Sequence, residues 1–303
     1  MKPILIIICG PTGIGKTKVA IEAAQALQCE IISADSRQIY KEMSIGTAVP
    51  SDSELAVVRH HFIKTHSIHT YYNASMFEVE VLEFLEDHFK QKNCIIMVGG
   101  SGLYIDAVCK GIDELPTIEK EVRIKWQEIF KNKGLEFLQE QVRENDPEYF
   151  SSADIQNPKR LLKAIEVFEM TGKPYSSFLK KKPQERSFSI LKIGLNTKRE
   201  VLYERINQRV DRMMEAGLTE EAKKLYPYRK LTPLNTVGYK ELFEHFDGKL
   251  TLEKAREQIQ NHSRAYARRQ LTWFRRDKDI KWYEPQNTEY IIQYIENQIV
   301  KHQ

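Results

Sequence analysis

The sequence predicts an α/β protein whose core is a doubly wound parallel sheet, interrupted by a helical insertion. Three observations support this prediction. Apolar runs alternate with helical patterns through the first 100 residues, a glycine-rich loop follows the first run, and a charged stretch without strand-like runs begins after Leu115-Pro116. Continuous apolar runs are typical of strands buried on both faces of a parallel sheet.

The expected elements follow one another in the order that such a sheet requires. Residues 3–10, 30–36 and 94–100 are short, mostly apolar runs that we interpret as buried strands. Apolar residues recur at helical spacing after the glycine-rich loop, and again over 75–91. The order strand–helix–strand–helix–strand therefore favours the α/β class.

The middle of the chain predicts a separate helical segment. Residues 117–186 contain charged, helix-like sequence, whereas 187–196 alternates like a strand that returns to the sheet, and 280–284 is a candidate edge strand. We therefore expect a discontinuous core domain, 1–116 with 187–303, and a helical insertion domain over 117–186.

Composition restricts the compartment and the partners. The chain has 303 residues, a net charge of +4 and 41% hydrophobic residues, so a nucleic-acid partner is permitted but not required. Its four cysteines lie far apart, which predicts neither disulfides nor a zinc site. No apolar run approaches the roughly 20 residues that span a bilayer, and we find no signal-peptide pattern. We expect a cytoplasmic monomer without a membrane partner.

The loop after the first strand fits the phosphate-binding pattern G-x4-G-K-[ST], through Gly10, Pro11, Thr12, Gly13, Ile14, Gly15, Lys16 and Thr17. Glycines allow backbone N–H groups to turn toward phosphate oxygens, the lysine adds a positive charge, and the Thr17 hydroxyl can hold Mg²⁺. The following helix adds its positive N-terminal end. A strand before the loop and a helix after it predict a P-loop NTPase-like core.

One feature of that loop's usual surroundings is missing. P-loop NTPases typically hold the metal with an Asp at the end of an apolar strand, but the strand over 94–100 leads into Gly99-Gly100-Ser101. Asp35 closes the second strand instead, and the carboxyl ends of parallel strands face the ligand crevice. We therefore expect Asp35 beside the loop, where it either acts chemically or caps the next turn.

Eight blocks together resemble the bacterial tRNA dimethylallyltransferases, nearly from end to end. In chain order they are GPTGIGKT, SADSRQIYKEMSIGTAVP, RHHFI, VGGSGLYI, NPKRLLKAIEV, TGKP, VGYKEL and RRQLTWFRR. The resemblance implies transfer of a dimethylallyl group from its diphosphate to N6 of adenosine 37, beside the anticodon, in tRNAs that read codons beginning with U. A few positions depart from the family pattern, including Ser101 where Thr is common, but none of these departures removes a chemical group that the reaction needs.

The resemblance also implies roles for individual residues. Asp35 would be the general base that takes the amine proton, Ser101 would position the amine, and Lys16 with Arg209 would neutralise the diphosphate. The implied tRNA contacts are Asp35, Ser36, Arg37, Gln38, Ser101, Arg123, Lys159, Arg160, Leu161, Leu162, Lys163, Asn235, Gly238, Tyr239, Lys240, Arg268, Arg269, Gln270, Trp273 and Arg275. Mg²⁺ is the implied cofactor, and the anticodon stem-loop and dimethylallyl diphosphate are the implied partners.

Three other functions remain open from the residues alone. The phosphate loop also suits a small-molecule kinase, and a related prenyltransferase could modify free adenine nucleotides. A non-catalytic RNA-binding protein would fit the basic, aromatic stretch 262–283, in which charged groups suit phosphates and rings suit bases. His60, His61, His66 and His69 invite a metal interpretation, but no nearby Cys or carboxylate motif completes a site.

Overall fold

The computed structural model describes residues 2–113, 115–116, 118–179 and 184–301. The chain divides into two compact units, a larger one of Met1–Lys110 with Glu185–Gln303 and a smaller one of Gly111–Gln184. The sequence placed these boundaries a few residues away, at 116/117 and 186/187. Residue 117 and residues 180–183 of the expected insertion lie outside the described residues.

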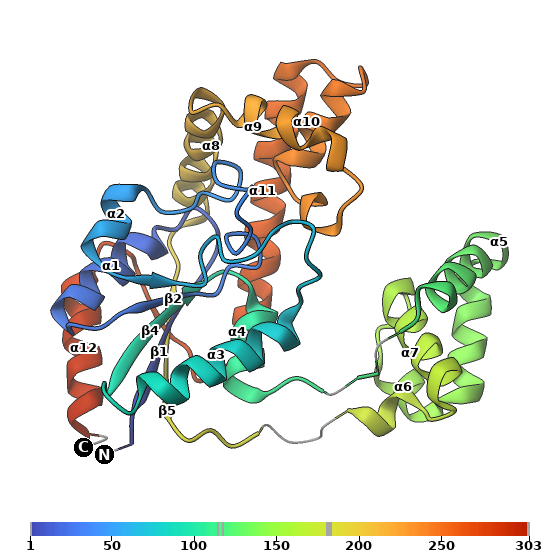
Figure 1. The fold of residues 1–303 in the computed structure, drawn as a ribbon, viewed down its shortest axis with the longest axis horizontal. Coiled ribbons are helices and arrows are strands. Elements are labelled where there is room, and N and C mark those ends of the chain that lie inside the picture. The colour runs from blue at the N-terminus through green and yellow to red at the C-terminus, as the bar shows by residue number, and fades with distance from the viewer. Residues whose placement is uncertain (1, 114, 117, 180–183, 302–303) are drawn as a thin grey trace. The chain divides into compact units, whose positions relative to one another are not determined.

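The larger unit is built on a six-stranded sheet in which every pair of neighbouring strands is parallel (Figure 1). The strand order is β3-β2-β4-β1-β5-β6. In chain order the strands are β1 (Ile4–Cys9), β2 (Ile31–Ser33), β3 (His60–His61), β4 (Cys94–Gly99), β5 (Ser189–Leu195) and β6 (Lys281–Tyr283). All six residues of β1 are buried, as expected of a central strand. The predicted α/β class and the returning and edge strands are confirmed.

Helices cover both faces of this sheet. Ile4, Ile6 and Ile8 pack with residues of α1 (Lys16–Ala26), α8 (Arg199–Glu215) and α12 (Thr288–Lys301). Ile7 points to the other face, where it lines a cavity with Ile105 of α4 (Gly102–Lys110). The remaining helices of this unit are α2 (Asp52–Val57), α3 (Ala74–His88), α9 (Leu218–Leu225), α10 (Tyr239–Phe246) and α11 (Leu252–Phe274), with short 3-10 turns at Tyr226–Tyr228 and Thr232–Leu234.

The smaller unit is a helical cluster with its own core. It contains α5 (Lys120–Asn145), α6 (Pro147–Ser152), α7 (Pro158–Thr171) and a 3-10 turn at Tyr175–Phe178. Trp126 and Leu138 of α5 pack against Leu161 and Ile165 of α7. The α7 helix ends at Gly172, whose φ of 67° places it in the left-handed region that terminates helices. The expectation of a helical segment here is confirmed.

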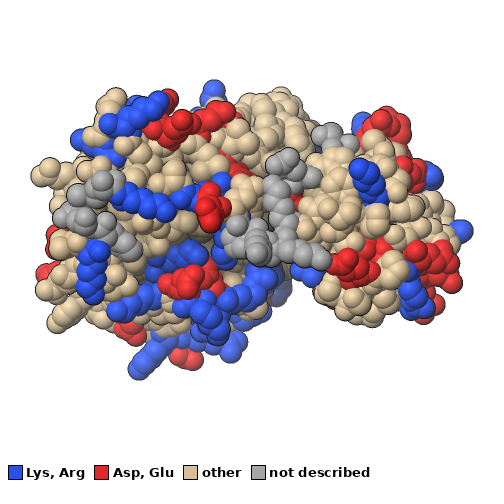
Figure 2. Space-filling view, turned by 90° about the horizontal axis from the view of Figure 1, so that it is seen from below, with Lys and Arg blue, Asp and Glu red and all other residues tan. Residues whose placement is uncertain are grey.

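Charged side chains are unevenly distributed over the surface. Figure 2 shows a face of the larger unit on which many Lys and Arg side chains gather, with acidic side chains among them, and the smaller unit also presents both signs there. None of the helices in the described part of the chain combines the length and the apolar character needed to cross a membrane.

Candidate active site

The phosphate loop lies between β1 and α1, as its motif requires, and two kinds of constraint demand its glycines. Gly13 and Gly15 have φ angles of 78° and 100°, which side-chain-bearing residues rarely adopt. A Cβ on Gly10 would lie 2.6 Å from the backbone oxygen of Leu195 on the neighbouring strand. The loop therefore has the open backbone and the adjoining helix N-terminus that suit an anion.

Lys16 is the first residue of α1, at the end of this loop. Its Nζ donates a hydrogen bond of 2.8 Å to the backbone oxygen of Pro11. Burial, followed by the positive charge of Arg209, lowers the Lys16 pKa to about 8. Both cations line a cavity of about 120 Å³, which we call the inner cavity. Thr17 and other residues of the phosphate loop line it as well, and so does Asp35. Two positive groups that repel one another here favour a ligand of high negative charge.

We predict that inorganic diphosphate binds more weakly as the pH rises through about 8, because Lys16 loses its charge there. If only the charged lysine binds well, the affinity falls by up to about tenfold between pH 7 and 9. Calorimetric titration in buffers of different ionisation enthalpy would show proton uptake on binding near pH 8. Lys16→Arg should flatten this dependence, since a guanidinium keeps its charge over the range; the same slope in both proteins would contradict the assignment.

Asp35 follows β2 and lies beside the loop, as the sequence predicted. Its Oδ1 accepts hydrogen bonds from the backbone N–H groups of Arg37 and Gln38, at 2.9 and 3.4 Å. The capping role and the chemical role are therefore compatible, because Oδ2 has no hydrogen-bond partner among the described residues. The carboxylate interacts electrostatically with both Lys16 and Arg209.

Ser101 lies at the end of the adjacent strand β4 and is 9% exposed. Its Oγ accepts a 2.9 Å hydrogen bond from the backbone N–H of Ser36, and its own N–H donates to the Ala34 oxygen at 3.3 Å. Ser101 thus holds the turn that contains Asp35. The carboxyl ends of two neighbouring parallel strands bring these residues together, as expected for the ligand edge of such a sheet.

A second cavity, of about 350 Å³, adjoins the first and is called the outer cavity here. Thr12, Asp35, Arg209 and Tyr266 line both cavities, so Asp35 lies on their common wall. Several of the predicted tRNA-contact residues line the outer cavity: Ser36, Arg37, Asn235, Gly238, Lys240 and Arg269. The structure therefore brings together residues from the first 40 positions and from the C-terminal third of the chain.

Tyr266 was not among the predicted site residues. Burial, followed by the negative charge of Asp35, raises its pKa to about 12, so its hydroxyl remains a hydrogen-bond donor at neutral pH. The helical spacing held a signal, because Tyr266 precedes Arg269 and Gln270 by three and four residues and shares their face of α11. That signal does not distinguish a site tyrosine from a core tyrosine.

A carboxylate that the sequence did not single out supports the rim of the outer cavity. Glu221 accepts hydrogen bonds from the backbone N–H groups of Ser44, Ile45 and Gly46, at 3.0, 2.9 and 2.9 Å. It also accepts one of 2.6 Å from the Tyr239 hydroxyl. Because a Cβ on Gly46 would lie 2.6 Å from the Tyr239 ring, this position requires glycine.

The predicted tRNA contacts need correction for two side chains. Tyr239 and Leu161 are both 0% exposed. The Tyr239 hydroxyl donates its hydrogen bond to Glu221, and Leu161 packs in the core of the smaller unit. Neither side chain can therefore reach an RNA in this conformation. Helical geometry explains this, since a contiguous block on a helix always includes residues that point inward.

Other residues of the larger unit that were predicted to contact tRNA also form contacts within the protein. Gln38 accepts from the Ser33 hydroxyl and donates to the backbone oxygens of Thr47 and Ala48. Arg268 is exposed and donates to the Tyr203 hydroxyl at 2.9 Å. Arg275 is exposed at the end of α11, and Gln270 and Trp273 pack inward from the same helix. Contact with tRNA stays a prediction for Gln38, Arg268, Trp273 and Arg275, whereas Gln270 is buried and its amide is bonded within the protein.

In the smaller unit, α7 presents Lys159 and Arg160 to solvent, whereas Leu162 is half-buried against the core. Arg123 of α5 and Lys163 of α7 both interact electrostatically with Glu166, whose burial raises its pKa. Basic groups from two helices are thus brought together in this unit.

The histidines take structural positions. His60 and His61 form strand β3, and the His61 Nε2 lies 2.6 Å from the Glu30 carboxylate. The His66 Nε2 lies 3.4 Å from the Glu80 carboxylate. The described part of the chain contains no group of three or more His, Cys, Asp or Glu side chains that could hold a metal ion.

Comparisons with known proteins agree on one family. The family model described as IPP transferase matches residues 38–277. The chain is 48% identical to tRNA dimethylallyltransferase 1 of Phocaeicola vulgatus, over 97% of this chain and 98% of that protein. It is 49% identical to the tRNA dimethylallyltransferase of Christiangramia forsetii, over 99% of both.

Solved structures extend this likeness to the fold. The full-length tRNA isopentenylpyrophosphate transferase of Bacillus halodurans superposes with a TM-score of 0.72 at 32% identity, over 100% of both chains. A eukaryotic dimethylallyltransferase described as acting on tRNA superposes with a TM-score of 0.83, over 99% of this chain and 80% of that one. Its 24% identity supports the fold alone.

Proposed function

Because the chain belongs to the IPP transferase family, we propose that it transfers a dimethylallyl group from dimethylallyl diphosphate to N6 of adenosine 37 in tRNA. The expected products are N6-dimethylallyl adenosine and diphosphate, and the acceptors are tRNAs that read codons beginning with U.

The position of Asp35 is the observation that supports this function best. Its side chain lies on the wall common to the inner cavity, which has the phosphate loop, and the outer cavity, which has polar and basic residues from the C-terminal third. A transfer reaction needs a donor site and an acceptor site that meet at the reacting atoms. A proton acceptor is required where they meet, because the adenine amine loses a proton as it bonds to carbon.

The proposed reaction follows from these positions. The amine attacks the allylic carbon as the bond from that carbon to the diphosphate oxygen breaks. The Asp35 carboxylate takes the amine proton, and Lys16, Arg209 and the loop N–H groups stabilise the charge that develops on the diphosphate. Ser101 and Tyr266 supply hydroxyl groups beside the same turn, where they can orient the amine.

Mg²⁺ is the proposed cofactor, and the residues present fit it. Thr17 and Asp35 line the same inner cavity, and Mg²⁺ typically binds few protein oxygens together with substrate phosphates and water. The Thr17 hydroxyl would hold the ion, which would supply further positive charge for the leaving diphosphate.

The tRNA would be recognised in its anticodon stem-loop, with adenosine 37 drawn out of its stack into the outer cavity. Arg37, Lys240 and Arg269 provide positive charge along that cavity. We further propose that the protein acts as a cytoplasmic monomer.

We predict that tRNA affinity falls steeply with added salt, because phosphate contacts release counterions from the RNA. Filter binding from about 50 to about 300 mM salt would give a straight line of log Kd against log salt. Lys240→Ala should weaken binding and reduce this slope by about one. A flat response in the wild-type protein would contradict an electrostatic mode of recognition.

Mass spectrometry of the nucleosides formed from an RNA hairpin and dimethylallyl diphosphate tests the proposed function. We expect dimethylallyl adenosine only when donor and hairpin are both present. ATP alone, and AMP as acceptor, test the kinase and the nucleotide prenyltransferase. Turnover with either, without modified hairpin, would overturn the proposal.

A further inference from the structure

Side chains of helix α11 pack closely against the turn that contains Ser101, at the residues just before and just after it. A Cβ on Gly100 would lie 2.3 Å from the Gln270 Nε2, and a Cβ on Gly102 would lie 2.3 Å from the Trp273 Cδ1. The two glycines that flank Ser101 are therefore needed for close packing against the helix.

Gln270 joins this turn to the phosphate loop through one amide group. Its Nε2 donates to the Gly100 backbone oxygen at 2.9 Å, and its Oε1 accepts from the Thr12 N–H at 2.8 Å. Because a backbone oxygen only accepts and a backbone N–H only donates, the amide orientation is determined. The side chain is 6% exposed, so water does not readily replace these bonds.

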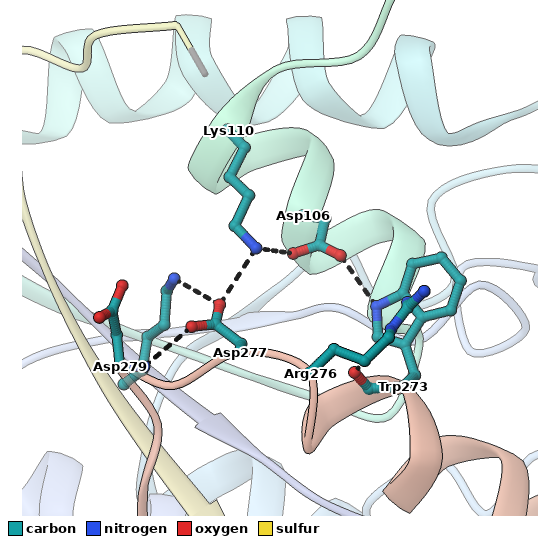
Figure 3. Close-up of polar contacts among 7 residues, drawn as sticks. Asp106, Lys110, Trp273, Arg276, Asp277 and Asp279 are labelled. Carbon is teal, nitrogen blue, oxygen red and sulfur yellow. Dashed lines mark hydrogen bonds and ion pairs between the residues drawn. The ribbon is translucent and has the colours of Figure 1, made fainter. Parts of the chain in front are cut away.

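The end of α11 that holds Gln270 is itself fixed by a polar network (Figure 3). The Trp273 indole N–H donates to Asp106 Oδ2 at 2.8 Å, and Asp106 pairs with Lys110 at 3.0 Å. Asp277 pairs with Lys110 and with Lys192 of β5, at 3.1 and 2.7 Å. These contacts connect α11 to α4 and to the central sheet.

We propose that Gln270 is a positioning residue that sets the distance between the diphosphate site and the acceptor site. Thr12 belongs to the loop that would hold the diphosphate, and Gly100 directly precedes Ser101. Ser101 in turn holds Ser36, the neighbour of Asp35. This role rests on the proposed function and differs from the tRNA contact that the resemblance implies. A displacement of about 1 Å between reacting groups can lower a rate by about 100-fold.

Two variants remove either both of the Gln270 hydrogen bonds or only the one to Gly100. Gln270→Met has a similar volume and loses both bonds, whereas Gln270→Glu still accepts from Thr12 but cannot donate to Gly100. We expect kcat for hairpin prenylation to fall about 10- to 100-fold in each, with the Kd of the hairpin within about twofold of the wild-type value. Gln258→Met, the same change earlier on α11, should leave kcat unchanged and serves as the matched control.

A double-mutant cycle tests whether Gln270 acts through Ser101. In a Ser101→Ala background the effect of Gln270→Met on kcat should shrink several-fold, because the group that it positions is gone. Full additivity would overturn the proposal, and so would a weakened hairpin Kd with unchanged kcat, which would indicate a tRNA contact. If Gln270→Met is unfolded by circular dichroism, Gln270→Glu decides by the same criteria. An inactive wild-type protein would instead count against the proposed function.

Discussion

Replacing Asp35 with Asn is expected to lower kcat for hairpin prenylation by at least about 100-fold, the usual scale for a lost general base. The amide Oδ1 can still accept from the N–H groups of Arg37 and Gln38, so the turn should keep its conformation. What is lost is the ability to take a proton from the adenine amine. Single-turnover measurement with saturating donor isolates this chemical step.

Binding measurements distinguish the lost base from a damaged site. Inorganic diphosphate should bind the Asp35→Asn variant at least as tightly as the wild-type protein at neutral pH, because a negative neighbour has been removed. Asp154→Asn is the matched control, since the Asp154 Oδ1 also accepts from a backbone N–H two residues later, on the exposed surface of the smaller unit. Near-wild-type turnover in Asp35→Asn would refute the assignment.

The sheet could be predicted because its central strands are buried on both faces. The segments that form β1 and β4 are almost entirely apolar. In an α/β protein, short apolar segments of this kind are typical of central strands. Strand β3 could not be predicted, because it consists of His60 and His61 alone and exists only through pairing with β2. A two-residue strand has no sequence period to recognise.

Part of the site was predictable for a similar reason. Asp35 and Ser101 come at the ends of strands, and the ends of neighbouring parallel strands meet at one edge. Tyr266 and Glu221 could not be found in this way, because their positions depend on how the C-terminal helices pack around the sheet. Tyr239 shows the opposite error, because it was predicted to contact tRNA and is buried. A resemblance over a block of sequence implies the same role for every residue of the block, whether its side chain points outward or inward.

The second large effect is expected at Lys16. Lys16→Met should lower kcat/KM for dimethylallyl diphosphate by about 100- to 1000-fold, the range seen when one group that stabilises developing negative charge is removed. Lys18→Met is the matched control, because Lys18 lies on the same helix with a side chain that is 78% exposed. Its ion pair with Glu22 is of the exposed kind that contributes little.

Arg209 provides a further test of this assignment. After burial, the positive charge of Arg209 is the next cause that lowers the Lys16 pKa, so Arg209→Met should raise it. The pH midpoint for diphosphate binding should then move above about 8, even though the affinity at neutral pH falls with the loss of one cation. An unmoved midpoint would contradict the electrostatic interaction between Arg209 and Lys16. A raised midpoint would show that the two cations lie close enough to interact, and a weaker affinity at neutral pH in the same variant would indicate that both bind the diphosphate.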